Sequence, residues 1–91
     1  MDKVLAFNIV ADELKELHER KNKDYGNSFS KTFEDLGIIS SVTRMSDKMN
    51  RLTNLVTKGN QQVKDESIED TLKDLASYAI MTIVELRDKK D

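Results

Sequence analysis

Apolar residues recur at intervals of three and four along most of the chain, which is the spacing of one face of an α-helix. The first such segment runs from about Asp2 to Asn22 and carries Phe7, Val10, Leu14 and Leu17 on one stripe. It should end where turn-forming residues gather, namely Asn22, Asp24, Gly26, Asn27 and Ser28. A short helical turn is expected over residues 29–36, with Gly37 ending it.

Two further segments have the same periodicity. A second helix is predicted from Ile38 to Lys58, where a heptad-like seam suits packing against another helix, and Gly59 follows as a helix-ending residue. A third helix should begin near residues 65–67, because Ser67 and Asp70 have the spacing of a capping box, and run to about Arg87. The seam of the second helix consists of Ile38, Val42, Met45, Met49, Leu52 and Val56.

Residues 76–86 of the third helix are apolar in nearly all directions, and such a helix must be covered on all sides. Two other helices of a 91-residue chain can hardly provide that cover. We therefore expect a single all-α domain over residues 1–91, with three main helices plus a short helical turn. We also expect this domain to be a homo-oligomer, a helical bundle of two or more chains.

Composition narrows the classes of function. The net charge is −2, with 15 Lys and Arg against 17 Asp and Glu, so nothing in the bulk charge favours direct DNA binding. No apolar run is long enough to span a membrane, and the N-terminal segment lacks a secretory pattern. The chain has no Cys and one His, which argues against disulfides, zinc–thiolate sites and a Ser-His-Asp triad. These features fit a cytoplasmic protein.

The third helix carries the first candidate chemistry. Glu66, Asp70 and Asp74 are spaced four residues apart and share one helix face. Stacked carboxylates of this kind can hold Mg²⁺ or Mn²⁺. The alternative is a solvated acidic first turn that complements the helix dipole. That alternative accounts less well for Asp74, which adjoins the apolar stretch and needs a partner.

The second helix carries a basic stripe formed by Arg44, Lys48 and Arg51, with Asp47 on its flank. A basic stripe beside a carboxylate stripe suits a metal-bound polyphosphate, because the acids hold the ion while Arg and Lys hold the phosphate oxygens. Asp47 is a further candidate metal ligand. Interhelical salt bridges explain the same spacing equally well.

The segment between the first helix and the short turn offers Lys21, Lys23 and Tyr25. Lys can meet phosphate, and Tyr can stack on a base. An ordinary polar turn with Tyr25 folded onto the core remains open. His18 lies near the core stripe of the first helix and is expected to be a packed side chain.

Three segments carry a resemblance to a known family. They are Lys21-Asn22-Lys23-Asp24-Tyr25-Gly26, Arg44-x-x-Asp47-Lys48-x-x-Arg51-Leu52, and residues 65–78 with Asp70, Asp74 and Tyr78. In this order they resemble the family called nucleotide modification associated domain type 1, found mainly in phages and prophages. The third segment also resembles the ion-binding helix of the all-α MazG-type nucleoside triphosphate pyrophosphohydrolases.

The resemblance implies a phage-type protein, in the host cytoplasm, that hydrolyses a (deoxy)nucleoside triphosphate or modified nucleotide to monophosphate and pyrophosphate. Glu66, Asp70 and Asp74 would then be catalytic ligands of Mg²⁺, and the basic stripe with Lys21, Lys23 and Tyr25 would bind the substrate. One carboxylate pair of the MazG pattern has cations in its place here. This favours a second hypothesis, a non-catalytic nucleotide binder or DNA-modification accessory protein. A helical protein-interaction module is the third.

Overall fold

The computed structural model is all-α: the residues it describes form four helices and no strand. The description covers residues 1–25, 27–58 and 64–88, without the side chains of residues 24, 25 and 64–66. No helix in these ranges is long and apolar enough to cross a bilayer. The helices are α1 (Lys3–Tyr25), α2 (Ser28–Leu36), α3 (Ile38–Lys58) and α4 (Lys64–Asp88).

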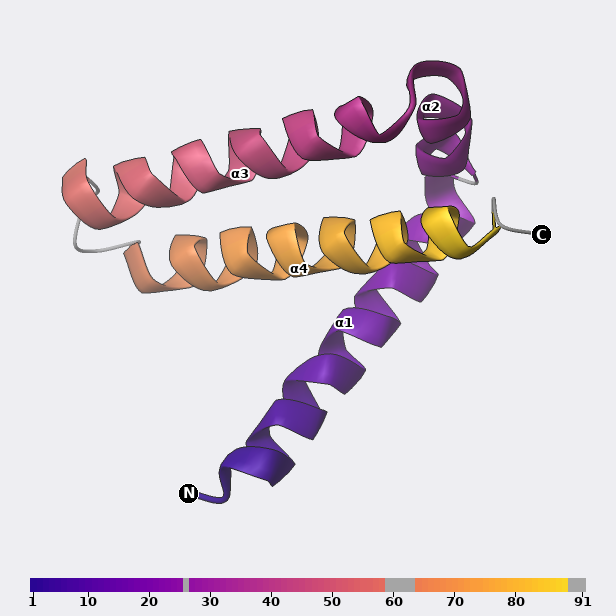
Figure 1. Cartoon of the computed structure of the whole chain (residues 1–91). Coiled ribbons are helices and arrows are strands. Elements are labelled where there is room, and N and C mark those ends of the chain that lie inside the picture. Colours follow the sequence, from indigo (N-terminus) through magenta and orange to yellow (C-terminus); the bar gives the residue numbers. More distant parts are fainter. Residues whose placement is uncertain (26, 59–63, 89–91) are drawn as a thin grey trace.

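The helices α3 and α4 form an antiparallel hairpin, and α2 lies at the end of the hairpin where α3 begins and α4 ends (Figure 1). The C-terminal half of α1 crosses α4, while its N-terminal half extends away from the other helices (Figure 1). An ion pair marks the crossing, because Lys73 of α4 lies 3.2 Å from the carboxylate of Glu13 on α1.

Most helix boundaries follow the hydrophobic pattern. The prediction for residues 38–58 is confirmed at both ends, and the short turn is a helix of nine residues. Gly37 separates these two helices with a φ of 81°, and its N–H donates to the Phe33 carbonyl at 2.7 Å. A positive φ is strained for residues with a Cβ, so glycine suits this joint.

The other two long helices lie within a few residues of their predicted bounds, although each differs at one end. α1 continues past Asn22 to Tyr25, because the low helix propensity of Asn and Asp is too small an effect to end a helix by itself. The helix α4 begins at Lys64, so Ser67 lies inside it and does not form a capping box. Its carbonyl instead accepts a hydrogen bond from Thr71 Oγ1 at 2.7 Å. The expected helix-ending Gly59 lies outside the described residues.

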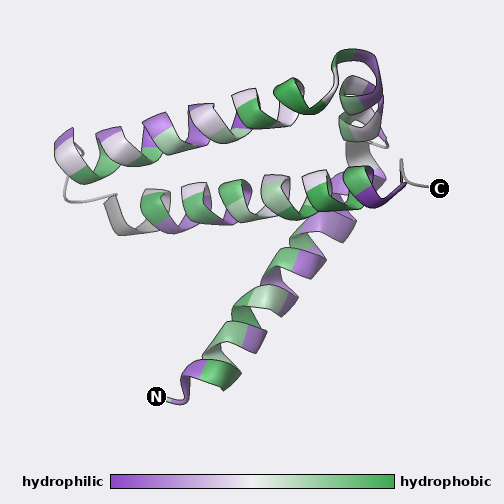
Figure 2. Ribbon diagram, in the orientation of Figure 1, coloured by the Kyte–Doolittle hydropathy of each residue, from purple (hydrophilic) through white to green (hydrophobic). Residues whose placement is uncertain are grey.

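The core of the single chain is thin. Phe33 is the one apolar side chain among the described residues that is buried, at 2% exposed. The contacts between the helices bury small polar residues instead, namely Ser41, Thr71 and Thr82. Hydrophobic residues run along all of α4 and much of α1 (Figure 2), and many of them are about half exposed. One chain therefore leaves much of its apolar surface uncovered.

Candidate functional site

Three predicted site residues from different helices meet at one carboxylate. Lys48 of α3 lies 3.0 Å from one oxygen of Asp74, and Lys21 of α1 lies 3.6 Å from the other. The side chains of Asp74 and Lys48 are about one quarter exposed, whereas that of Lys21 is about half exposed. Asp74 therefore has the cationic partners that its position beside the apolar stretch requires.

An aromatic pair lies next to this cluster. The rings of Phe29 on α2 and Tyr78 on α4 are nearly parallel, at 13°, with centroids 6.2 Å apart. The guanidinium carbon of Arg44 lies 5.2 Å from the centroid of the Phe29 ring and 5.8 Å from that of Tyr78. Cation–π attraction to both rings holds Arg44 at this position. Tyr78 is one helical turn after Asp74, and Arg44 is one turn before Lys48, so each pair shares a helix face.

A pocket of about 150 Å³ lies between α1, α2, α3 and α4, and Lys48 adjoins it only through its contact with the lining residue Asp74. An apolar cavity of roughly that volume holds one benzene ring. The pocket can thus admit a single aromatic or sugar ring, while any attached charged group would lie at its mouth. The lining residues are Leu17, His18, Lys21, Asn22, Ser28, Phe29, Arg44, Asp74, Ser77, Tyr78 and Met81.

A second hollow of about 240 Å³ adjoins the first and shares His18, Asn22, Phe29 and Met81 with it. At its edge the hydroxyl of Ser30 donates to a carboxylate oxygen of Glu85 at 2.5 Å, which joins α2 to the end of α4. This second hollow is bounded by α1, α2 and α4.

Other predicted residues lie elsewhere. Arg51 donates from Nε to Thr71 Oγ1 at 3.2 Å, and with Asp47 it lines a shallow groove on α3 that also includes Lys58. The basic stripe therefore divides between the pocket and this groove. Asp70 and Lys23 are exposed and line neither the pocket nor the groove. The side chains of Tyr25 and Glu66 lie outside the described part of the chain.

The donor set around Asp74 does not fit a divalent metal ion. Both carboxylate oxygens of Asp74 are paired with lysine ammonium groups, which a cation would have to displace. Within the described residues, no three His, Asp or Glu side chains are grouped so that they could hold an ion together. The chemistry available at this cluster is recognition of an anion by Lys21, Lys48 and Arg44.

Sequence reasoning did not select Phe29, Tyr78 or His18 as site residues. Phe29 was expected only as the first residue of the short turn, and His18 as a packed side chain near the core stripe. A signal was present in the spacing, because Tyr78 follows Asp74 by four residues and Arg44 precedes Lys48 by four. On antiparallel helices, two such pairs can meet at the same level.

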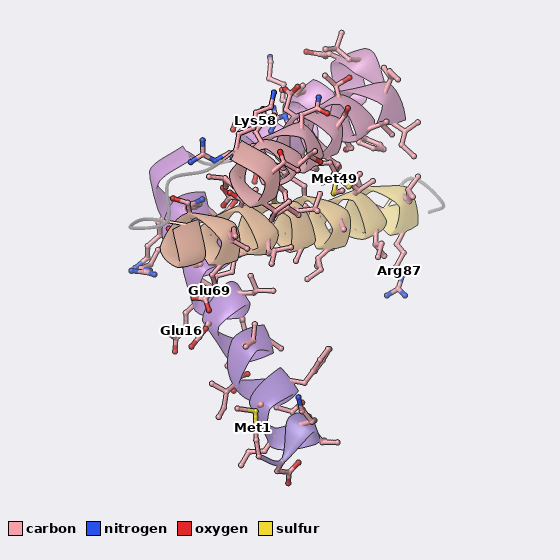
Figure 3. All side chains as sticks on the ribbon, turned by 90° about the vertical axis from the view of Figure 1, so that its left-hand side faces the viewer. Met1, Glu16, Met49, Lys58, Glu69 and Arg87 are labelled. Carbon is pink, nitrogen blue, oxygen red and sulfur yellow. The ribbon has the colours of Figure 1, made fainter. Side chains whose placement is uncertain are left out.

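The carboxylates of α1 have a structural partner rather than a place in the pocket. Glu13 contacts Lys73, which also lies 3.5 Å from Glu69 one turn earlier on α4. The hydrogen bond that Lys73 donates to the Glu13 carboxylate is the main cause that raises the pKa of Lys73 above 10.5. Figure 3 shows Glu16 of α1 and Glu69 of α4 near this crossing. The E-x-x-E pair Glu13 and Glu16 thus lies beside the α1–α4 contact.

The geometry described so far does not by itself assign the chain to one class of protein. Its main features are an all-α fold, an aromatic pair in contact with Arg44, and a pocket lined in part by Lys21. Residues 21–86 match the profile of the family described as nucleotide modification associated domain 1. The match covers most of the chain, so the protein belongs to this family. A search of the curated proteins found no match. A search of the solved structures found none either. Membership in the family associates the protein with nucleotide-related function.

Proposed function

We propose that the pocket binds a nucleotide, with the base or sugar in the ring-sized hollow and the phosphates at the three cations. The observation that carries the proposal is the convergence of Lys21, Lys48 and Arg44 beside the Phe29–Tyr78 pair. An aromatic face stacks on any base, and Arg and Lys pair with phosphate oxygens.

The charge at the site favours a polyphosphate. Lys21 and Arg44 line the pocket and Lys48 pairs with Asp74 beside it, so three positive charges face the one carboxylate found among the described lining residues. The whole chain has a formal net charge of −2, so an anionic ligand is attracted to the positive charges at this pocket and not to the protein as a whole. A nucleoside triphosphate would gain more from it than a nucleoside.

Binding is the function proposed here, and Mg²⁺-dependent hydrolysis to monophosphate and pyrophosphate is the alternative that the test must separate. Hydrolysis would require carboxylates free to hold an ion, whereas Asp74 is engaged by two lysines. The third possibility, a helical interaction module without a small-molecule ligand, leaves the convergence of aromatic and cationic side chains without a role.

Calorimetric titration with (deoxy)nucleoside triphosphates, a nucleoside and inorganic pyrophosphate tests the proposal, each with and without Mg²⁺. We expect triphosphates to bind most tightly, pyrophosphate to bind weakly and the nucleoside weakest. Pyrophosphate release is assayed in the same samples. A binder releases none, while a hydrolase releases it only with Mg²⁺. Absence of binding by every nucleotide would refute the proposal.

Two pairs of variants assign the ligand to the pocket. Phe29→Leu should weaken binding of triphosphate but not of pyrophosphate, whereas Phe7→Leu on the exposed part of α1 should change neither. Lys48→Gln should weaken binding of both ligands, with Lys31→Gln on α2 as its exposed control. If a variant at the site and its control lost affinity equally, the ligand would bind elsewhere on the protein.

A further inference from the structure

The chain exposes far more surface than a compact monomer of its mass. Its accessible surface is 7222 Å², while a folded monomer of 10.4 kDa exposes about 5,400 Å². The excess of about 1,800 Å² per chain is comparable with what each partner buries in an obligate dimer, about 1,000–2,500 Å². The uncovered surface is therefore large enough to hold two chains together.

Part of this surface is a straight row on α4. Leu72, Ala76, Ala79, Ile83 and Leu86 follow steps of +4, +3, +4 and +3, which is the spacing of a helix-packing seam. The three large members of the row are between 41% and 49% exposed. The row lies about 80° around the helix from the buried and half-buried residues facing α3, which include Thr71, Leu75 and Thr82.

A matching row lies on α3. Val42, Met49 and Val56 are seven residues apart, and each is about half exposed. Because α3 and α4 are antiparallel, both rows face the same side of the hairpin, while Arg44, Asp74 and the pocket face the other side. The hairpin thus has a ligand-binding side and a separate apolar side.

The row on α4 is complementary to itself. If two copies of α4 cross in antiparallel fashion about a point between residues 77 and 78, Leu72 of one meets Ile83 of the other, and Ala76 meets Ala79. The same register brings Glu69 within one residue of the level of Arg87. In Figure 3 both of these side chains leave α4 on the side away from α3, at opposite ends of the helix. Large residues meet large ones, small meet small, and acid meets base.

We propose that a second copy of this chain covers the apolar side of the hairpin, in a two-fold dimer with antiparallel α4 helices at its centre. The side chain of Glu69 is 73% exposed in the single chain, so it can accept Arg87 of the partner subunit besides its contact to Lys73. The alanines in the middle of the row allow the two helix backbones to approach closely. This interface leaves the pocket open.

Disulfide trapping tests the register directly, because the chain has no Cys of its own. The double variant Glu69→Cys with Arg87→Cys should form a covalent dimer under mild oxidation. An internal bond is impossible, since 18 residues of helix separate the two positions by about 27 Å. Glu69→Cys alone and Arg87→Cys alone should stay unlinked. Linking by either single variant as efficiently as by the double variant would overturn the antiparallel register.

Sedimentation equilibrium tests the interface. The unmodified protein should have twice its chain mass of 10.4 kDa, and Ile83→Asp should raise the dimer dissociation constant by at least about 100-fold. Leu36→Asp, at a 65% exposed position at the end of α2, should leave the mass unchanged. The helical circular dichroism of each variant is compared with that of the unmodified protein at equal concentration. A monomer at every concentration, or dissociation by Leu36→Asp and not by Ile83→Asp, would overturn the proposal.

Discussion

Asp74→Asn should weaken the fold and strengthen nucleotide binding at the same time. In the free protein Asp74 neutralises Lys48 and Lys21, which are two of the three cations assigned to the phosphates. The amide keeps the size of the side chain but loses its negative charge. The free protein then loses two ion pairs, while a bound polyphosphate no longer competes with an internal anion for the same lysines.

The loss of stability follows from the two contacts. The pair with Lys48 is short, at 3.0 Å, and both side chains are about three quarters buried, so a charged hydrogen bond of this kind contributes about 1.5–3 kcal/mol. The pair with Lys21 is longer and half exposed, and contributes about 0–1 kcal/mol. Because Asn still accepts a hydrogen bond, a net loss of about 2 kcal/mol is expected. For a domain of this length that lowers the Tm by about 8–16 °C.

The gain in affinity has the same origin. A triphosphate that binds Lys48 and Lys21 must take them from Asp74, and relief of about 1–2 kcal/mol tightens binding by about 5–30-fold. If Asp74 were a metal ligand, the same substitution would weaken nucleotide binding instead of strengthening it. If Asp74 held Mg²⁺, Asp74→Asn would abolish any Mg²⁺-dependent component of binding or turnover.

Thermal denaturation and calorimetric titration of Asp74→Asn measure both quantities at one protein concentration, because association would otherwise shift the Tm. Asp70→Asn serves as the control, since Asp70 is an exposed acid one turn earlier on the same helix. It should change the Tm by no more than about 3 °C and leave triphosphate affinity unaltered. An Asp74→Asn variant with lowered Tm and weakened triphosphate binding would refute the reasoning.

Three further predictions concern stability. Ser41→Ala should leave the free energy of unfolding unchanged or raise it by up to about 1 kcal/mol in urea denaturation, because the Ser41 hydroxyl is fully buried without a hydrogen-bond partner in the described residues. A clear fall in the free energy of unfolding would mean that the Ser41 hydroxyl has a hydrogen-bond partner such as a water molecule. Gly37→Ala should destabilise by about 1–2 kcal/mol, through the φ of 81° alone, because the space around it is open. An unchanged midpoint in the same assay would contradict this strain. The pKa of Lys73 is raised by its hydrogen bond to Glu13. The stability that this pair adds to the folded protein is therefore fully present below pH 10.5 and is lost as pH rises through the raised pKa. The stability difference between the unmodified protein and Lys73→Met should therefore shrink above pH 10.5, and a constant difference would exclude the pair as its source.

The helices themselves could be predicted from the sequence because they depend on local spacing. The bounds of residues 38–58 and the joint at Gly37 follow from apolar periodicity and from a residue that tolerates positive φ. The end of α1 could not be located in this way. The preference of Asn22 and Asp24 for turns is worth only about tenths of a kcal/mol per residue, which is too little to fix the residue at which the helix ends.

The candidate site could be predicted only as separate stripes. The cations Arg44 and Lys48 are neighbours on one helix, so their shared face was evident from spacing. Spacing could not separate them from Arg51, which follows on the same stripe but bonds to Thr71 on the partner helix. The packing of α3 against α4 places Arg51 beside Thr71, and the spacing within one helix does not encode such an interhelical contact.

The sequence by itself determined an all-α chain with acidic and basic faces and more apolar surface than three helices can cover. Its 3.6-residue periodicity is a property of each segment alone. Only the tertiary structure decided that Lys21 and Asp74, 53 residues apart, form an ion pair, and that Phe29 and Tyr78 stack beside Arg44. Such contacts depend on the angles and offsets between helices, which the summed packing of the whole chain sets.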